Sequence, residues 1–382
     1  MAGLYIHIPF CASRCIYCAF YSTTSLKLRD LYVNMLCKEM ELRKDEVDTI
    51  HTIYLGGGTP SLLSPQNLTQ IFKQIDASFN LSKNQEITIE CNPDDITPNF
   101  VEALGTLPIN RISMGVQTFD NNRLRFLHRR HTPQDVYNAV KKLQKANISN
   151  ISIDLIFGFP GELLSDWEAD IDKALSLNIQ HISAYSLTYE ENTVLNKLKA
   201  NGSVSEIEEE ISIRMFQRLK ERLEQADFEH YEISNFAKRT ITANGVASSY
   251  RSRHNSSYWH AVPYIGIGAA AHSYDGTTRK WNVADLQTYM DSINRAILPY
   301  EMESLNTETQ YNDCITTTLR TKEGIDLALF KEKFGKHLYQ YLLHESEQYL
   351  NRGLLVIQND HLALSQQGIF VCDMIMTDLM YI

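Results

Sequence analysis

The feature that most constrains the fold of this chain is a sixfold alternation of short β-branched or aromatic runs with longer segments of helical period. Parallel strands joined by right-handed crossover helices produce this alternation. The expected strands span 4–8, 52–55, 87–90, 112–116, 151–156 and 182–187. The expected helices span about 29–44, 66–78, 99–105, 133–146 and 165–175. Six units are too few for a closed eight-stranded barrel, so we expect an α/β fold, a partial (βα)6 TIM-like barrel, with its active residues at the carboxyl ends of the strands.

The sequence divides into three predicted parts. Residues 1–230 hold the six repeats and end in an acidic helix near 205–225, and residues 231–300 form a loop-rich, aromatic connecting region packed on this core. In residues 301–382, helices are expected at about 307–320, 327–334 and 338–352. A hairpin over 354–364 follows, with its turn at Asn359-Asp360. We therefore expect a C-terminal helical, winged-helix-like domain.

Charge argues against nucleic acid as a partner. The chain carries 36 Lys and Arg against 46 Asp and Glu, a net charge of −10, so it has no general attraction to nucleic acid or anionic lipid. Residues 301–382 hold 6 basic and 12 acidic residues. This balance favours a packing or partner-docking role over DNA binding. Peripheral membrane contact and homodimer formation are both compatible with this charge balance.

The cysteines and the N-terminus indicate the cellular compartment. Seven cysteines, three clustered and four scattered, do not form the framework of a disulfide-rich secreted domain. Polar residues and cysteines interrupt residues 4–20, which therefore lack the apolar core of a signal peptide. The longest apolar stretches, such as 264–271, are too short to span a bilayer. We expect a cytoplasmic protein without a transmembrane segment.

Three cysteines directly after the first predicted strand carry the strongest chemical signal. Cys11, Cys15 and Cys18 follow the spacing C-x3-C-x2-C. Thiolates suit iron–sulfur clusters or zinc, but a closed zinc site commonly needs a fourth ligand, and no second cysteine pair follows. A [4Fe-4S] cluster held by three cysteines leaves one iron open for an exogenous ligand. The count therefore favours a cluster over zinc or uncoordinated thiols.

The segment CASRCIYC, with Tyr17 before the third cysteine, resembles the signature of the radical S-adenosylmethionine (SAM) superfamily. The resemblance implies that the methionyl amino and carboxylate groups of SAM chelate the open iron. The family binds the amino group with a glycine-rich segment, and Gly57, Gly58 and Thr59 in GGGTP follow the second predicted strand. Glycines let backbone approach a ligand closely, although a glycine run alone more often marks a turn.

Further residues match the family's cofactor contacts in their order along the chain. Glu90 in ECNP matches the ribose-binding acid, because a carboxylate can accept both ribose hydroxyl hydrogens. The remaining predicted SAM contacts are Gln117, Arg129, Asp154, Tyr5, Ile156 and Ser186. Singly, these residues have ordinary explanations, such as a solvated arginine, a capping aspartate or a core tyrosine. Their order at successive strand ends favours the SAM role.

The segments LYIHIPFC, GGGTP, ECNP, RISMGVQ and DLIFGFPG together resemble the HemN/HemW group of this superfamily, densely over 4–282 and more weakly beyond. The group contains the oxygen-independent coproporphyrinogen III oxidase, a radical decarboxylase, and the HemW-type haem chaperones. The oxidase has a further cysteine two residues after its third cluster cysteine, where this chain has Phe20. It also has a long segment before its cluster motif, whereas ten residues precede Cys11 here. Both differences favour the chaperone class.

A third feature, a short motif near residue 254, also favours the chaperone class. His254, Asn255 and Tyr258 form HNxxY, which resembles the haem-binding motif of the chaperone class, and imidazole and tyrosine both serve as axial ligands of haem iron. Without this context, a histidine in a polar loop is more often a hydrogen-bonding surface residue. We expect a chaperone that transfers haem to haem-requiring proteins, respiratory proteins among the candidates. The radical decarboxylase is the alternative.

Overall fold

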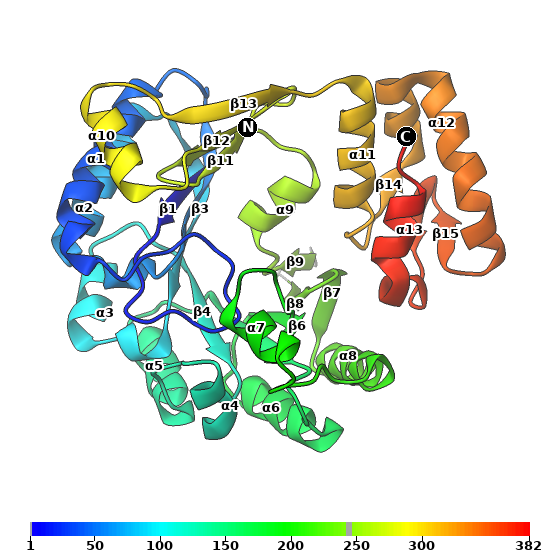
Figure 1. Cartoon of the computed structure of the whole chain (residues 1–382), viewed down its shortest axis with the longest axis horizontal. Helices are drawn as coiled ribbons and strands as arrows, with labels where there is room; N and C mark the ends of the chain where they lie inside the picture. Colours follow the sequence, from blue (N-terminus) through cyan, green and yellow to red (C-terminus); the bar gives the residue numbers. More distant parts are fainter. Residues whose placement is uncertain (1, 242–246) are drawn as a thin grey trace.

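The computed structural model describes residues 2–241 and 247–382, and it is built on one long sheet flanked by helices (Figure 1). Within the described residues the main sheet has 13 strands, in the order β13-β12-β11-β10-β1-β2-β3-β4-β5-β6-β8-β7, with β9 paired to β8. Its first six strands are β1 (Ala2–Ile8), β2 (Ile50–Gly57), β3 (Leu81–Cys91), β4 (Arg111–Gln117), β5 (Ile151–Phe157) and β6 (His181–Ser186). These six pair in parallel in sequence order, as predicted.

Helices connect these parallel strands at the predicted places. They are α1 (Arg29–Leu42), α2 (Pro65–Ser78), α3 (Pro98–Leu104), α5 (Pro133–Lys145) and α6 (Leu164–Ser176), with a short unpredicted helix α4 (Asn121–Phe126). The start of α5 is encoded locally, because Thr132 and Asp135 form a reciprocal capping box and Pro133 occupies the first turn. The predicted α/β fold with a parallel, barrel-like core is confirmed.

The core explains why the strands read as continuous apolar runs. β1 and β5 are buried along nearly their whole length, because helices cover one face and the barrel interior the other. Most of the buried apolar side chains of the six strands and of α1, α2, α5 and α6 belong to one cluster. This frame fixes the strand ends from which the candidate site is built.

Residues 231–300 were expected to be loop-rich, but much of this segment is strand. β10 (Tyr264–Ile267) pairs in parallel with β1, and β11 (His272–Tyr274), β12 (Thr278–Asn282) and β13 (Tyr300–Ser304) continue that edge antiparallel. At the opposite edge lie β7 (Phe228–Glu232), β8 (Asn235–Ile241) and β9 (Ala247–Ser249). Such short edge strands carry little local pattern and form through pairing with the sheet. The expected boundary at residue 230 therefore falls inside β7.

Four helices accompany these edge strands. α7 (Val194–Ala200) and α8 (Glu209–Gln225) lie between β6 and β7, α9 (Arg253–Trp259) precedes β10, and α10 (Leu286–Asn294) precedes β13. The acidic helix expected near 205–225 is α8. Short 3₁₀ turns complete the main unit at Leu26–Leu28, Pro60–Leu62 and Pro93–Asp95.

The C-terminal unit has its own buried core and the predicted order of helices and hairpin. It contains α11 (Thr307–Thr318), β14 (Ile325–Asp326), α12 (Leu327–Asn351), β15 (Leu355–Gln358), β16 (His361–Leu364), the 3₁₀ turn η4 (Gly368–Val371) and α13 (Cys372–Asp378). α12 is broken at Gly335, whose φ of 77° is not helical, so the two helices expected over 327–352 are confirmed. The hairpin turns at Asn359 and Asp360, both with positive φ.

This C-terminal unit is joined to the edge of the main sheet. The amide of Ile233 donates to the carbonyl of Arg320, and the amide of Lys322 donates to the carbonyl of Tyr231. The rings of Phe216 on α8 and Phe370 in η4 meet edge-on at 5.7 Å. The C-terminal unit therefore reaches the side of the sheet where the parallel strands end.

Candidate cofactor and ligand site

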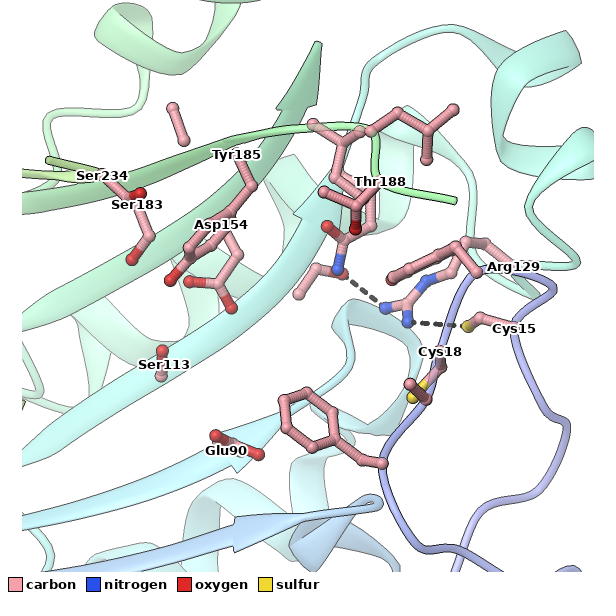
Figure 2. Close-up of a pocket in the computed structure, with 18 of the residues that line it drawn as sticks. Cys15, Cys18, Glu90, Ser113, Arg129, Asp154, Ser183, Tyr185, Thr188 and Ser234 are labelled. Carbon is pink, nitrogen blue, oxygen red and sulfur yellow. Dashed lines mark hydrogen bonds between the residues drawn. The ribbon is translucent and has the colours of Figure 1, made fainter. Parts of the chain in front are cut away.

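A cavity of about 990 Å³ lies inside the barrel and at the carboxyl ends of its strands (Figure 2). This volume is at the upper end of the ~300–1,000 Å³ typical of small-molecule sites. Its wall comes from the loop that carries the three cysteines, from β2 to β6, from α8 and from Ile369 and Phe370 of the C-terminal unit. The site is thus formed by both parts of the chain.

The cysteine loop forms one end of the cavity, and Figure 2 shows Cys15 and Cys18 there. Arg129 donates to the Sγ of Cys15 at 3.5 Å, and the hydroxyl of Thr59 points to the Sγ of Cys11 at 3.8 Å. Burial raises the pKa of the Cys11 and Cys18 thiols. Donors aimed at sulfur favour the thiolate, the form that binds metal.

The three thiols suit an iron–sulfur cluster by their chemistry. All three are free and line the same cavity. Within the described residues, no three Cys, His, Asp or Glu side chains converge as they would around a single metal ion. A cubane cluster makes a different demand, because each cysteine binds a separate iron corner. The residues present therefore fit the predicted cluster, with Arg129 and Thr59 as supporting donors.

The glycine segment lies beside the cysteine loop and packs closely against β1. This close packing excludes larger residues. Gly57 has a φ of 109°, and a Cβ there would lie 2.4 Å from the His7 ring. The amide of Gly58 donates to the carbonyl of Ile8 at 2.8 Å. Gly57, Gly58 and Thr59 all line the cavity, as the predicted SAM contacts should.

Glu90 faces the cavity at the end of β3 and is held by two donors. The hydroxyl of Tyr54 donates to its Oε1 at 2.7 Å, and the amide of Gly57 donates to its Oε2 at 3.0 Å. Burial raises the pKa of Glu90 to about 7, and the nearby Asp154 carboxylate adds to that rise, whereas the two donors oppose it. The carboxylate is therefore oriented, and its charge is only partly stabilised by the protein.

Arg129 and Gln117 lie between the cysteines and the strand ends. Besides Cys15, Arg129 donates to the side-chain oxygen of Asn92 and the carbonyl of Gly115, both at 2.5 Å. Gln117 ends β4 with a positive φ of 68°, which turns the chain at the cavity wall. The guanidinium thus links the cysteine loop to β3 and β4.

The remaining predicted SAM contacts differ in position. Asp154, Ile156 and Ser186 line the cavity on β5 and β6, and burial raises the pKa of Asp154 to about 6 against the opposing effects of Ser183 and Arg111. Tyr5 does not line it. Its hydroxyl hydrogen-bonds the Nδ1 of His7 at 2.9 Å, and its ring stacks on Tyr54. Tyr5 therefore supports the wall from behind.

Comparison with known proteins identifies the family. The Radical SAM superfamily model matches residues 5–174, and the HemN C-terminal domain model matches residues 305–371. The chain is 34% identical to Heme chaperone HemW of Bacillus subtilis, covering 96% of both chains. It is 32% identical to Heme chaperone HemW of Lactococcus lactis, covering 95% of this chain and 93% of that one. The chain belongs to the HemW family of the radical SAM superfamily.

A solved structure shares the whole fold of this HemW-family chain. Coproporphyrinogen III oxidase (HemN) from Escherichia coli matches with a TM-score of 0.83 over 99% of this chain and 90% of that chain, at 18% sequence identity. At this identity the likeness shows the fold alone. In the described residues of the HemW-family chain, every helix is too short or too polar to cross a membrane.

The HNxxY residues are arranged differently from the expected polar loop. In this HemW-family chain they lie on α9, and the His254 ring is buried against the sheet, hydrogen-bonded to the Oγ1 of Thr52 through Nδ1 and to the hydroxyl of Tyr258 through Nε2, both at 2.8 Å. Burial lowers the pKa of His254 to about 3, and the charge of Arg111 adds to this. With both ring nitrogens occupied, His254 is not free to ligate haem iron here.

Asn255 is the member of HNxxY that lines the cavity of the HemW-family chain. The motif is anchored by Glu86, whose two carboxylate oxygens accept the amides of Arg253 and His254. The His254 ring also stacks on Tyr54 at 5.0 Å. Because Tyr54 also donates to Glu90, the stacked rings of His254 and Tyr54 connect α9 to the Glu90 carboxylate.

Sequence reasoning missed several residues of this HemW-family site. Tyr54 orients Glu90, Asn92 receives Arg129, Arg111 lies at the inner wall, and Phe370 comes from the C-terminal unit. Alternation along β2 and β4 could have placed Tyr54 and Arg111 on the interior face. No local signal marks Phe370, because its role depends on how the two units pack.

Proposed function

We propose that this chain binds haem and passes it to haem-requiring acceptor proteins, and that it carries a [4Fe-4S] cluster and SAM. The observation that carries this proposal is the similarity to Heme chaperone HemW of Bacillus subtilis over 96% of both chains. The similarity covers the barrel and the C-terminal unit together, and these two parts form the cavity wall.

Cys11, Cys15 and Cys18 would hold the cluster, which when bound offers an open iron to the methionyl group of SAM. The chain's own contribution is to stabilise thiolates in a buried loop. Arg129 and Thr59 direct donors at two of the sulfurs, while burial favours the protonated thiols. Cluster binding must therefore displace thiol protons.

Glu90 is proposed to accept the ribose hydroxyls of SAM. Tyr54 and the Gly57 amide hold the carboxylate in one orientation, so that it need not reorganise when a ligand arrives. Gly57, Gly58, Thr59, Gln117, Arg129, Asp154, Ile156 and Ser186 provide the rest of the proposed SAM wall. Tyr5 contributes by supporting Tyr54.

HNxxY is proposed to act in haem binding through a division of roles. Asn255 faces the cavity, whereas His254 and Tyr258 hold α9 in place through their mutual hydrogen bond and Thr52. His254 is thus a positioning residue in this proposal. Its use as an iron ligand would require one of its two hydrogen bonds to break, because imidazole binds iron through a single ring nitrogen.

The proposed setting is the cytoplasm, where reducing conditions keep thiols free. All seven cysteines of the chain are free thiols in the structure. The acceptors are haem-requiring proteins, respiratory ones among the candidates, and a homodimer is a further possibility for this family member. The acidic balance of the chain, −10, disfavours nucleic acid as a partner.

The deciding experiment uses full-length protein reconstituted anaerobically with iron and sulfide. Haem is titrated and followed by its Soret band, transfer to an apo-haem protein is measured, and the same preparation with SAM and reductant is assayed for coproporphyrinogen III decarboxylation. We expect saturable haem binding and transfer without decarboxylation. Multiple-turnover formation of protoporphyrinogen IX without specific haem binding would replace the chaperone proposal with the decarboxylase.

A further inference from the structure

Arg111 carries a buried positive charge, and no described residue forms an ion pair with it. It begins β4 and is only 1% exposed. Its Nε has no hydrogen-bond partner, and among the described residues no ion pair includes its guanidinium. An unpaired charge removed from water is strongly unfavourable. Arg111 also lines the wall of the cavity.

Arg111 lies at the end of the cavity away from the cysteine loop. Gln117 ends the same strand beside that loop, and at ~3.3 Å per residue the six steps from Arg111 to Gln117 span roughly 20 Å. A group bound at the cysteines therefore lies at the opposite end of β4 from the backbone of Arg111. This separation favours a partner for the guanidinium that fills the inner part of the cavity.

The side chains around Arg111 leave its charge available. The positive charge of Arg111 lowers the pKa of both His181 and His254, after the larger effect of burial, so both rings stay neutral. The ring nitrogens of His181 bond Ser152 and the hydroxyl of Tyr231. Glu90 and Asp154 feel the same charge but make no ion pair with it. Arg111 is thus the cation of the inner wall, flanked by neutral rings.

We propose that Arg111 anchors a carboxylate subsite at the inner end of the cavity. A guanidinium and a carboxylate pair through two parallel hydrogen bonds, which is the strongest way to satisfy a buried arginine. The identity of the ligand rests on the proposed function. The two candidate sources are a propionate of haem and the methionyl carboxylate of SAM. The second is expected at the cysteine loop, so the span of β4 favours the propionate.

The test compares each ligand with its carboxylate-free counterpart on reconstituted full-length protein. The ligands are haem and haem dimethyl ester, then SAM and decarboxylated SAM, and the proteins are wild type, Arg111→Gln and Arg111→Lys. Arg130→Gln is the matched control, because Arg130 lines the outer cavity and already pairs with Asp94 and Asp95. Affinity and the ligand-induced rise in melting temperature are both measured.

We expect wild type and Arg130→Gln to bind haem at least about tenfold more tightly than its dimethyl ester, as loss of a charge-assisted hydrogen bond implies. Arg111→Gln should bind the two equally, and Arg111→Lys should keep part of the preference. Without ligand, Arg111→Gln should melt close to wild type, since the substitution removes no ion pair within the protein and only a longer-range attraction to Glu90 and Asp154. This last result separates a ligand-binding role from a structural one.

The outcomes distinguish the subsite from the proposed function. Wild type could bind SAM more tightly than decarboxylated SAM without distinguishing haem from its dimethyl ester. If Arg111→Gln then abolishes the preference for SAM, the subsite stands with the SAM carboxylate as its ligand. If wild type also fails to bind haem, the chaperone proposal fails while this subsite remains. The subsite itself is overturned if wild type binds neither haem nor SAM more tightly than its carboxylate-free counterpart, or if Arg111→Gln keeps the wild-type preference.

Discussion

At the scale of single residues, Glu90 presents a carboxylate to the cavity that Tyr54 and the Gly57 amide hold in one orientation. Its pKa is raised to about 7 because burial and Asp154 oppose the charge more than Tyr54 and Gly57 support it. Ribose hydroxyls would donate to the ionised carboxylate and complete its stabilisation. The ligand and the ionised form of Glu90 should therefore favour each other.

We predict that Glu90→Gln weakens SAM binding by about ten- to a hundredfold, from roughly 1.5–3 kcal/mol for a lost charge-assisted hydrogen bond. Because the ionised form binds the hydroxyls, the affinity of the wild type should rise with pH through about 7. The variant should lose the part of this rise that is due to Glu90. Calorimetry at several pH values checks both, with the visible absorption confirming an intact cluster. Equal affinity in the two proteins would remove Glu90 from the site.

The cysteines give the second prediction at this scale. Reconstituted wild type should hold about four irons per chain, and a protein with Cys11, Cys15 and Cys18 all changed to Ala should lose iron, sulfide and the visible absorption. Cys37→Ala is the control, because Cys37 lies on α1 and does not line the cavity. Full iron content in the triple variant would contradict the assignment.

At the scale of elements, α9 places one residue of HNxxY at the cavity and buries another against the sheet. Its seven residues are capped by Ser252 and tied to the sheet by His254 and Glu86, which leaves Asn255 at the cavity. A helix this short gains little stability from its own hydrogen bonds, so its tertiary contacts keep it formed.

We predict that His254→Ala and Asn255→Ala separate the structural support of α9 from the proposed contact with haem. His254→Ala should lower the free energy of unfolding by about 2–5 kcal/mol, because it leaves a cavity and deprives Thr52 and Tyr258 of a buried partner. Asn255→Ala should change stability by less than about 1 kcal/mol while weakening haem binding. Denaturant unfolding and Soret titration measure the two effects. A fully stable His254→Ala protein with a shifted Soret band would instead indicate direct ligation.

At the scale of the whole molecule, the C-terminal unit completes the cavity of the barrel. Ile369 and Phe370 line the wall, and Phe370 meets Phe216 of α8 across the junction. Backbone hydrogen bonds between Ile233 and Arg320 and between Lys322 and Tyr231 hold the two units together. A unit that resembles a DNA-binding fold in its order of helices and hairpin thus forms part of the cavity wall here.

We predict that Phe370→Ala weakens haem retention several-fold, because it removes apolar wall from the cavity and opens the junction with α8. Leu329→Ala on α12 is the matched control, since Leu329 is 62% exposed and does not line the cavity. Haem dissociation is measured by transfer to a high-affinity scavenger. Equal dissociation rates from Phe370→Ala and wild type would show that the C-terminal unit does not take part in retention.

The sequence by itself determined the features that depend on near neighbours. The six parallel strands follow from runs of apolar residues, the helix starts from capping residues such as Thr132 and Asp135, and the hairpin from the Asn359-Asp360 turn. The cysteine spacing and the order of Glu90, Gln117 and Asp154 on successive strands were equally readable. In each case the signal lies within a few residues or repeats with the strands.

Only the tertiary structure decided the features that depend on distant contacts. His254 is buried because it bonds Thr52, 202 residues away, and no local pattern distinguishes that position from a polar loop. The edge strands in 231–300 form because β1 and β6 offer open edges for pairing. The unpaired charge of Arg111 and the contribution of Phe370 follow in the same way, since burial and pairing belong to the assembled barrel rather than to any one segment.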